Sequence, residues 1–552
     1  MKTLFDMKVF ALLTVVFFTL SCSEAVKNDH EDVDTKQPNI VWISFEDISP
    51  YFSFYGDSTA STPTIDKLAS ESVIYSQVYS AAGVCAPSRS AIITGMYPTY
   101  LGTNHMRTGK DIMSWGKRVY KKEYGVTDTK GVNIPEYSAV IQPEIKCFPE
   151  FMRAEGYYCT NNSKTDYQFA APFTAWDEND NNAHWKHAPS DKPFFAVFNL
   201  NVTHESKLWK HKHLPLTVNP KDVTVPPFYP DNDSIRLDIA RQYSNIEMLD
   251  KQVAKLLQEL KDAGQYDNSY IFFFSDHGGA MPRGKREAIS SGLHVPFLVK
   301  YPKRMNKTGR DDKLISFVDL APSILELAGV KSPDYMQGVS MFSGSRKYIF
   351  AARDRMDEFT TKRRTVCDGR YLYVKHLIPN EVRYQNIQYR MKLTSMRNIY
   401  KLHNEGKLNK TQELWFTPLD GDEELYDLQN DPFEINNLAK NEEIKQTLER
   451  FRDVYTKWRN DISDRCKNPE SEMLEEMWPG GIQPTTANVF SELNDGIITL
   501  SCPTEGASIG YRVNNRAWKI YTKPLKVSDS EKIEFKAIRI GYKESSITSL
   551  DK

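Results

Sequence analysis

Carboxylate and imidazole side chains gather at three points along the chain, each just beyond a short apolar run. Carboxylate oxygens and imidazole nitrogens are ligands for divalent cations, and a histidine beside them can transfer a proton. An acidic pair after a strand is otherwise a common helix cap or solvated turn. The residues concerned are Glu46 and Asp47, His204, and Asp276 and His277.

A single cysteine, Cys85, stands in the segment Gly83–Gly95, and Pro87, Ser88 and Arg89 follow it closely. A lone cysteine is most often a small buried apolar side chain. If a helix begins near Pro87, however, Arg89 lies in its first turn, close to Cys85. The backbone N–H groups of that turn would also face an anion. These residues by themselves leave open whether Cys85 is a buried apolar side chain or a reactive group.

The elements that must position these residues are strands and helices in alternation. Apolar runs of strand length are rich in β-branched and aromatic residues, and helical patterns lie between them. Such strands predict a mostly parallel sheet covered by helices on both faces, with ligands beyond the carboxyl ends of its strands. Strands are expected within 38–45, 192–201, 268–277 and 294–302, and helices from 63, within 239–264 and within 315–330.

The 552-residue length predicts a large main domain with smaller ones attached. A formal net charge of −1 provides no global basic field, so no nucleic-acid partner is expected. From about residue 486, short alternating runs separated by turn residues predict a small all-β module, a β-sandwich. Proline and paired glycine in 466–485 are typical of a linker.

The N-terminus has the pattern of a signal peptide, 1–22. Lys2 and Lys8 precede the apolar run Val9–Leu20, which is short for a membrane span. Ser21 before Cys22 resembles a bacterial lipoprotein cleavage site. We therefore expect secretion across the inner membrane, to the periplasm or the outer membrane, with a membrane tether through lipidated Cys22.

The seven cysteines are scattered and contain no C-x-x-C motif, which excludes a disulfide-framework protein. Cys147 with Cys159, and Cys466 with Cys502, are two pairings that the sequence leaves open.

The segment Cys85–Gly95 resembles the signature of the type I, formylglycine-dependent sulfatases, which belong to the alkaline phosphatase superfamily. Further segments resemble sulfatase hallmarks in the same order along the chain, over roughly residues 38–465. The segments "FED", "TDYQ" and "FAARDRMDE" look closest to heparan N-sulfatase (sulfamidase)-like members. The hallmark segments are "NIVWISFED", "FFFSDHGG", "PRGKREAISSGLHVP" and "ELYDLQNDPFEINNLA".

This resemblance implies an alkaline-phosphatase-like α/β domain at 38–345 and a smaller α+β C-terminal subdomain at 346–465. The appended module, 486–552, resembles the chitobiase C-terminal type. The implied reaction removes O-sulfate or N-sulfate from a sulfated carbohydrate, expected to derive from a glycosaminoglycan, with another host or algal glycan as the alternative.

The resemblance also implies a role for each site residue. A maturation enzyme would oxidise Cys85 to formylglycine, whose hydrate attacks sulfur. Arg89, Lys164 and Lys285 would stabilise anionic oxygens, and His204 would protonate the leaving group. One divalent cation, expected to be calcium, would bind Glu46, Asp47, the residue at position 85, Asp276 and His277.

One part of the chain departs from the family pattern. In "GYYCTNNSKTD" the family lysine is present as Lys164, but Asp166 replaces a histidine that assists formylglycine turnover. Asp166 would contact the substrate, act as a base or orient another group. Four further residues would contact the sugar or form structural ion pairs: His105, Arg107, Arg353 and Asp354.

Two other functions compete with a sulfatase. A phosphatase or phosphodiesterase of the same superfamily usually needs two metals and a threonine or serine nucleophile, which Cys85 argues against. A glycan-binding lipoprotein with a decayed site is opposed by the intact set of acidic, basic and cysteine residues.

Overall fold

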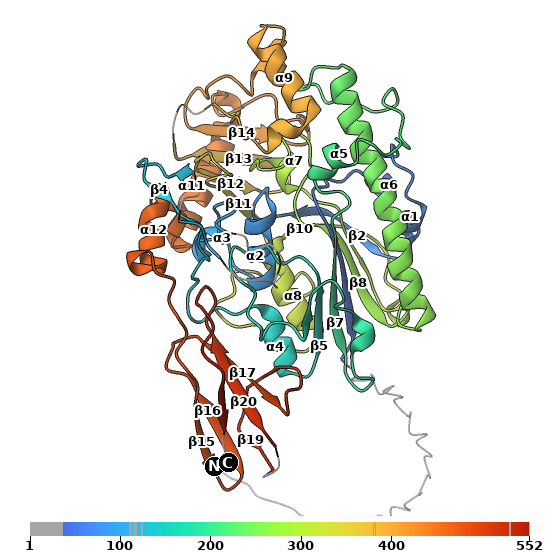
Figure 1. The fold of residues 1–552 in the computed structure, drawn as a ribbon. Helices are drawn as coiled ribbons and strands as arrows, with labels where there is room; N and C mark the ends of the chain where they lie inside the picture. The colour runs from blue at the N-terminus through green and yellow to red at the C-terminus, as the bar shows by residue number, and fades with distance from the viewer. Residues whose placement is uncertain are drawn as a thin grey trace, which may run out of the picture. The chain divides into compact units, whose positions relative to one another are not determined.

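The computed structural model describes residues 37–109, 113, 119–122, 125–378, 380, 382–528 and 531–550. The predicted signal peptide and Cys22 lie outside the described residues. Residues from Gln37 onward form one unit, which Figure 1 shows.

An eight-stranded sheet forms the centre of the main domain. The strands β8, β1, β7 and β5 are adjacent and parallel, as the sequence predicts, whereas β9 runs antiparallel to both of its neighbours. In spatial order the sheet contains β10 (Gly309–Ser316), β2 (Val73–Tyr79), β9 (Phe297–Lys300), β8 (Ser269–Ser275), β1 (Asn39–Phe45), β7 (Phe194–Leu200), β5 (Tyr158–Asn162) and β6 (Glu178–Asn179).

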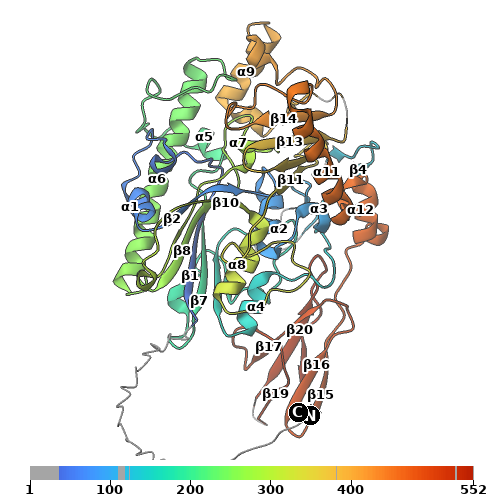
Figure 2. The same cartoon turned by 180° about the vertical axis from the view of Figure 1, so that it is seen from behind.

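Helices cover both faces of this sheet, which explains why its strands are apolar throughout. Ile40 and Trp42 of β1 pack into one core and Val41 and Ile43 into the other. Figures 1 and 2 show the helices of the two cores on opposite sides of the sheet. The first core includes α2 (Cys85–Thr94), α4 (Phe148–Ala154) and α8 (Leu320–Leu327), and the second includes α1 (Pro63–Ser70) and α6 (Asp233–Asp262).

Helix α6 begins before its predicted start. The side chain of Asn232 accepts hydrogen bonds from the backbone N–H groups of Ser234 and Ile235, and this cap starts the helix six residues upstream of Ile239. The observed end of the helix, Asp262, lies two residues before the predicted end at Gly264. Gly264 has a φ of 66°, a left-handed conformation that ends a helix.

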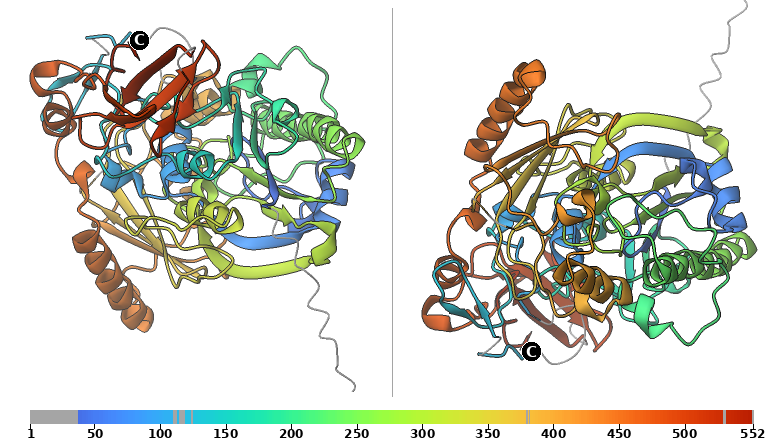
Figure 3. Two further views of the ribbon diagram at one scale, coloured as in Figure 1. Left: turned by 90° about the horizontal axis from the view of Figure 1, so that it is seen from below. Right: turned by 90° about the horizontal axis from the view of Figure 1, so that it is seen from above.

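A second sheet, whose four strands are antiparallel, follows the main domain along the chain, and short elements lie between the longer ones of the main domain. Figure 3 shows helix α11, in orange, lying along this C-terminal sheet. The short elements are α3 (Pro98–Leu101), β3 (Val126–Thr127), β4 (Asn133–Ile134), α5 (Ser206–Lys210) and α7 (Ser290–Leu293). The C-terminal part contains β11 (Ile349–Arg353), β12 (Arg363–Cys367), β13 (Tyr371–His376), α9 (Thr394–Asn404), α10 (Lys410–Glu413), β14 (Glu423–Asp427) and α11 (Lys445–Asp461).

The segment 466–485, expected to be a linker, contains a packed helix, α12 (Glu470–Met477). Met473, Leu474 and Met477 pack against Ile134 and Tyr137 in one hydrophobic cluster. The flanking proline and glycines are typical of a linker, but the apolar residues between them bury a helix face instead.

Two small antiparallel sheets at residues 490–550 share one hydrophobic core, in agreement with the predicted all-β texture. This module also contacts the main domain, since Arg153 Nη2 donates to the carbonyl of Trp518 at 2.9 Å. One sheet contains β15 (Phe490–Asn494), β16 (Ile497–Ser501) and β19 (Leu525–Lys526). The other contains β18 (Lys519–Ile520), β17 (Ser508–Val513), β20 (Ile533–Ile538) and β21 (Thr548–Leu550).

The six cysteines among the described residues are all free thiols, so neither Cys147 with Cys159 nor Cys466 with Cys502 forms a disulfide. Within the same residues, no helix is both long and apolar enough to cross a membrane.

Candidate active site

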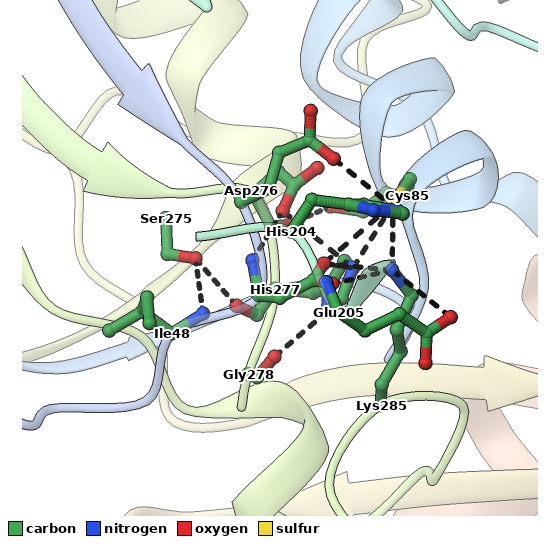
Figure 4. Close-up of polar contacts among 12 residues, drawn as sticks. Ile48, Cys85, His204, Glu205, Ser275, Asp276, His277, Gly278 and Lys285 are labelled. Carbon is green, nitrogen blue, oxygen red and sulfur yellow. Dashed lines mark hydrogen bonds and ion pairs between the residues drawn. The ribbon is translucent and has the colours of Figure 1, made fainter. Parts of the chain in front are cut away.

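The carboxyl ends of four neighbouring strands bring the predicted chemistry to one place. Parallel strands end at the same sheet edge, so side chains that follow β8, β1, β7 and β5 meet there. Figure 4 shows Cys85, His204, Asp276, His277 and Lys285 pointing toward one another. Hydrogen bonds lock this edge, because Ser275 Oγ accepts from the Ile48 N–H at 3.0 Å and donates to the His277 carbonyl at 2.8 Å.

Helix α2 presents Cys85 and Arg89 to this edge. It begins at Cys85, two residues before the expected start, because Val84 is extended and Pro87 fits the first turn of a helix. Residues four apart lie on one helix face, so Arg89 lies beside Cys85. Arg89 Nε donates to Asp276 Oδ2 at 3.0 Å.

A close backbone approach places Lys285 against Cys85. A Cβ atom on Gly83 would lie 2.2 Å from the Glu287 carbonyl oxygen, so only glycine fits here. The neighbouring Arg286 N–H donates to the Gly83 carbonyl at 2.6 Å. As a result, Lys285 Nζ lies 3.6 Å from Cys85 Sγ.

Four side chains are arranged as candidate ligands for one cation. The ligand atoms of Asp47, Cys85, Asp276 and His277 all lie within 4.8 Å of one another, and all four residues are buried. His277 Nδ1 donates to the Gly278 carbonyl at 2.9 Å, so Nε2 faces the carboxylates, 3.0 Å from Asp47 Oδ1. A hydrogen bond of this kind fixes the ring orientation of a histidine ligand.

Asp47 takes a left-handed backbone conformation, with φ of 62°. Aspartate tolerates this region better than bulky or β-branched residues do. The turn lets the Asp47 carboxylate accept from Lys285 Nζ at 2.7 Å and from the Glu205 N–H at 2.6 Å.

Glu46 belongs to a second, overlapping group of ligand atoms, with Asp47, Cys85 and His204. Its Oε2 atom lies 3.0 Å from Lys164 Nζ and 3.7 Å from His204 Nε2. Glu46 therefore lies between the candidate cation ligands and the Lys164 and His204 side chains.

Positive charge dominates the surroundings of Cys85. Burial would raise the pKa of its thiol, but the ammonium groups of Lys164 and Lys285 outweigh burial and lower this pKa to about 6. Burial would lower the pKa of His277, yet Asp276 and Asp47 raise it to about 10. The arrangement stabilises an anion at position 85 and a cation next to the carboxylates.

The orientation of His204 suits proton donation. Its Nδ1 atom accepts from the Ser206 N–H at 3.2 Å, which leaves Nε2 to carry the proton of a neutral ring. Nε2 is the atom that faces Glu46, and the His204 side chain is 17% exposed. The proton thus points into a site that a substrate can reach.

Sequence reasoning missed three buried or half-buried residues that support the site. Asn199 Oδ1 accepts from Arg89 Nη1 at 2.8 Å, and its Nδ2 donates to the Lys164 carbonyl at 3.2 Å. Glu205 accepts a bidentate pair of hydrogen bonds from Arg286 at 2.9 and 2.6 Å. In the sequence, only the position of Glu205 next to His204 could have indicated its role. No sequence feature marked Asn199, which lies within a strand.

Two of the five predicted substrate contacts lie at the site. Arg107 Nη2 lies 3.2 Å from Asp166 Oδ2, which is 3.4 Å from Lys164 Nζ. Burial would raise the pKa of Asp166, but the Arg107 guanidinium and the Lys164 ammonium hold it well below its ordinary value. Asp166 is therefore ionised and orients two cationic side chains.

The structure does not bring His105, Arg353 and Asp354 to this site. Arg353 and Asp354 are fully buried, and Arg353 donates to Glu287 at 2.6 Å. Asp354 lies 3.1 Å from Arg364.

His105 lies 3.5 Å from Glu470 and is 1% exposed. The acidic partners of His105 and Arg353 lie far away in the sequence, so the local pattern gave no sign of those ion pairs. Arg364, the partner of Asp354, lies on the neighbouring strand β12 of the same sheet. These contacts are the structural alternative that the sequence left open.

Comparison with known proteins agrees with this geometry. The Sulfatase family model matches residues 38–330. An ulvan-active sulfatase from Formosa agariphila is 39% identical and covers 97% of this chain and 96% of its own length. The human N-sulphoglucosamine sulphohydrolase is 23% identical, over 78% of this chain and 91% of its own.

A solved structure supports the fold. A putative sulfatase from Bacteroides thetaiotaomicron VPI-5482 superposes with a TM-score of 0.55 at 19% identity, over 78% of this chain and 97% of that chain. The family model, the full-length relative and the shared fold lead to one conclusion: this chain belongs to the sulfatase family.

Proposed function

We propose that this protein removes sulfate from a sulfated polysaccharide of the kind on which its ulvan-active relative acts. That relative aligns over nearly the whole of both chains. The human sulphohydrolase, which is named for an N-sulfated sugar, is less similar. We therefore favour ulvan over a glycosaminoglycan as the first substrate to test.

One observation carries the proposal: Cys85 Sγ belongs to both groups of candidate ligands and lies among three cationic side chains. A sulfate ester and its transition state are anionic, so a sulfatase needs a nucleophile surrounded by positive charge. The positions of Arg89, Lys164 and Lys285 around Cys85 meet this need.

The residues fit the two groups that sulfatases require. Position 85 faces the ligand cluster, as a formylglycine side chain would, and formylglycine supplies the hydroxyl group that attacks sulfur. Glu46, Asp47, Asp276 and His277 would hold a divalent cation, which lowers the pKa of a bound hydroxyl and polarises the sulfate. Three carboxylates favour calcium, although a histidine ligand is softer than calcium prefers.

The remaining residues divide the work of catalysis. Lys164 and Lys285 hold the sulfate oxygens as point charges. His204, protonated on both ring nitrogens, donates from Nδ1 to Ser206 Oγ, 2.9 Å away, and passes its Nε2 proton to the leaving oxygen, which leaves a neutral ring. Asp166, ionised between Arg107 and Lys164, orients them and is a weak base, so we assign it positioning and not proton abstraction.

We also propose that the protein is exported and held at a membrane by lipid on Cys22, and that a maturation enzyme outside the chain modifies Cys85. The sequence pattern at residues 1–22 supports export. Metabolic labelling with a fatty-acid analogue tests the tether, since Cys22→Ala should abolish the label.

The function is tested by sulfate release from ulvan oligosaccharides, measured by ion chromatography on protein coexpressed with a maturation enzyme. We expect sulfate from ulvan at a rate well above that from heparan N-sulfate disaccharides. Faster turnover of a phosphate monoester than of any sulfate ester would instead support the phosphatase alternative. Mass spectrometry of the peptide containing position 85 should show the aldehyde and not the thiol.

A further inference from the structure

Two aromatic side chains and a lysine meet beside His204, from segments that are far apart in the sequence. Trp209 lies on α5, five residues after His204, and Tyr389 and Lys392 come from the segment before α9. The Trp209 and Tyr389 rings meet edge to face, with centroids 5.2 Å apart. Lys392 Nζ lies 4.9 Å from the Tyr389 ring centroid and 5.9 Å from that of Trp209. We name these three residues the aromatic platform.

The platform borders the catalytic residues directly. Arg286, whose guanidinium donates two hydrogen bonds to Glu205, lies 5.8 Å from the Tyr389 ring centroid, so the ring borders the site. The Tyr389 hydroxyl also shares a side-chain hydrogen bond with Ser206, whose Oγ lies 2.9 Å from His204 Nδ1. A sugar ring over the platform would therefore lie next to the proton donor.

The platform is held rigidly. Arg390, next to Tyr389, is 1% exposed and donates through Nη2 to Glu287 Oε1 at 3.1 Å. Leu208 beside Trp209 and Leu393 beside Lys392 share one hydrophobic cluster. A binding surface fixed in advance loses little conformational entropy when a ligand binds.

The exposure and charge of the platform suit an anionic sugar. Trp209 and Tyr389 are half-buried, and Lys392 is exposed and makes no ion pair among the described residues. On the same segment as Trp209, three more lysines follow His204: Lys207, Lys210 and Lys212. Since the whole chain has a net charge of −1, this concentration of positive charge is local.

We propose that the aromatic platform is a glycan subsite: its rings pack against the sugar next to the reacting sulfate, and Lys392 binds a second anionic group on the glycan. This inference rests on the proposed sulfatase function. Flat rings offer a large apolar area at low entropic cost to the C–H face of a sugar. The exposed Lys392 ammonium adds an ionic contact with a carboxylate or a second sulfate.

A binding measurement on catalytically inactive protein tests the subsite independently of catalysis. Cys85→Ala protein, which keeps the platform, is titrated calorimetrically with ulvan oligosaccharides. Adding Lys392→Ala or Tyr389→Ala should raise Kd about tenfold, and Lys392→Arg should restore most of the lost affinity. Lys401→Ala, an exposed lysine on α9, is the matched control and should leave Kd unchanged.

Kinetics with active protein gives the second readout. For Lys392→Ala, the ratio of kcat/KM on ulvan oligosaccharides to kcat/KM on an aryl sulfate should fall about tenfold, mainly through KM. Melting temperatures check that each variant folds, and Tyr389→Leu, which keeps apolar bulk but removes the flat ring, replaces Tyr389→Ala if that variant unfolds.

The outcomes distinguish the two proposals. An unchanged Kd for both Lys392→Ala and the folded Tyr389 variant overturns the subsite, whatever the enzyme does. Loss of affinity in these variants, together with no sulfate release by the active protein, keeps the subsite and overturns the proposed reaction.

Discussion

At the scale of single residues, the site contains oppositely charged side chains in close contact, and their attraction is strong because they are buried away from water. Asp47 and Lys285 are both fully buried and meet at 2.7 Å, so each stabilises the charged form of the other. Removing one partner leaves an unpaired buried charge, which costs several kcal/mol in proteins. Site variants should therefore leave the Asp47–Lys285 pair intact, as the following changes do.

The first residue-scale prediction concerns the nucleophile. Cys85→Ala should reduce sulfate release at least about a thousandfold because no modified side chain remains to attack sulfur. The melting temperature should stay close to that of the parent, since alanine fits the same buried space. Cys502→Ala, in the β module, serves as the control and should keep full activity. Undiminished activity of Cys85→Ala would refute the assignment.

The second concerns the leaving group. His204→Ala should slow sulfated sugars by about 10²–10⁴-fold, but aryl sulfates with acidic phenols much less, because a good leaving group needs no proton. A plot of log kcat/KM against leaving-group pKa should become steeper in the variant. Equal losses on all substrates would mean that another residue donates the proton.

The third concerns the pH dependence of stability. Burial raises the pKa of Glu434 from 4.5 to about 7, with the Ser290 N–H as its partner at 2.8 Å. The folded state keeps this proton more tightly than the unfolded state, so Glu434 destabilises the fold as pH rises from about 5 through 7. Glu434→Gln should therefore raise the free energy of unfolding by roughly 1–3 kcal/mol at pH 8 and change it little at pH 4.

Denaturant titrations at both pH values measure this effect. Glu443→Gln, an exposed residue near α11, is the control and should show no pH-dependent gain. A gain for Glu434→Gln that is larger at pH 4 than at pH 8 would contradict the sign of the argument.

At the scale of elements, helix α12 ties the C-terminal region to the core of the protein. Glu470 at its start accepts hydrogen bonds from Arg355 at 2.6 and 2.8 Å and from Tyr137 at 3.0 Å. Arg355 lies just after β11, so this buried ion pair joins the helix to the C-terminal sheet. A segment that resembles a linker in composition thus acts as a structural anchor.

This anchor predicts a large difference between two neighbouring glutamates. Glu470→Ala should lower the free energy of unfolding by about 3–5 kcal/mol because it removes the carboxylate that accepts two hydrogen bonds from the buried Arg355 guanidinium. Glu472→Ala removes an exposed partner of Lys130 on the same helix and should cost less than about 1 kcal/mol. Chemical denaturation of both variants tests the contrast, and equal losses would refute the anchor.

At the scale of the whole molecule, the candidate cation site joins the ends of β1 and β8 to helix α2. A cation bound there would hold three elements together only in the folded state. Ligands that bind only the folded protein stabilise it by mass action.

Chelation should therefore lower both activity and stability. We expect excess chelator to reduce the melting temperature by roughly 5 °C and calcium to restore it. Differential scanning fluorimetry with added calcium or magnesium measures the effect and identifies the preferred ion. A melting temperature that does not respond to chelator or to either ion would contradict a structural cation.

The sequence by itself determined the chemistry and the framework. The strands at 38–45, 192–201 and 268–277 were predictable because strands buried on both faces are continuously apolar, and the acidic and imidazole residues behind them followed from the rule for parallel sheets. The segment at Cys85 indicated the family from residue types at fixed spacing alone.

Only the tertiary structure decided which charged residues serve the site. Arg107 and Asp166 lie at the site, whereas Arg353 forms an ion pair with Glu287 and Asp354 forms one with Arg364. The same limit applied to Asn199, Glu205, Arg286 and the aromatic platform, whose roles depend on long-range contacts. Hydrophobic periodicity predicts which face of an element is buried. An ion pair between residues on different segments forms only when those segments pack together, and the sequence near either residue does not show which partner it will have.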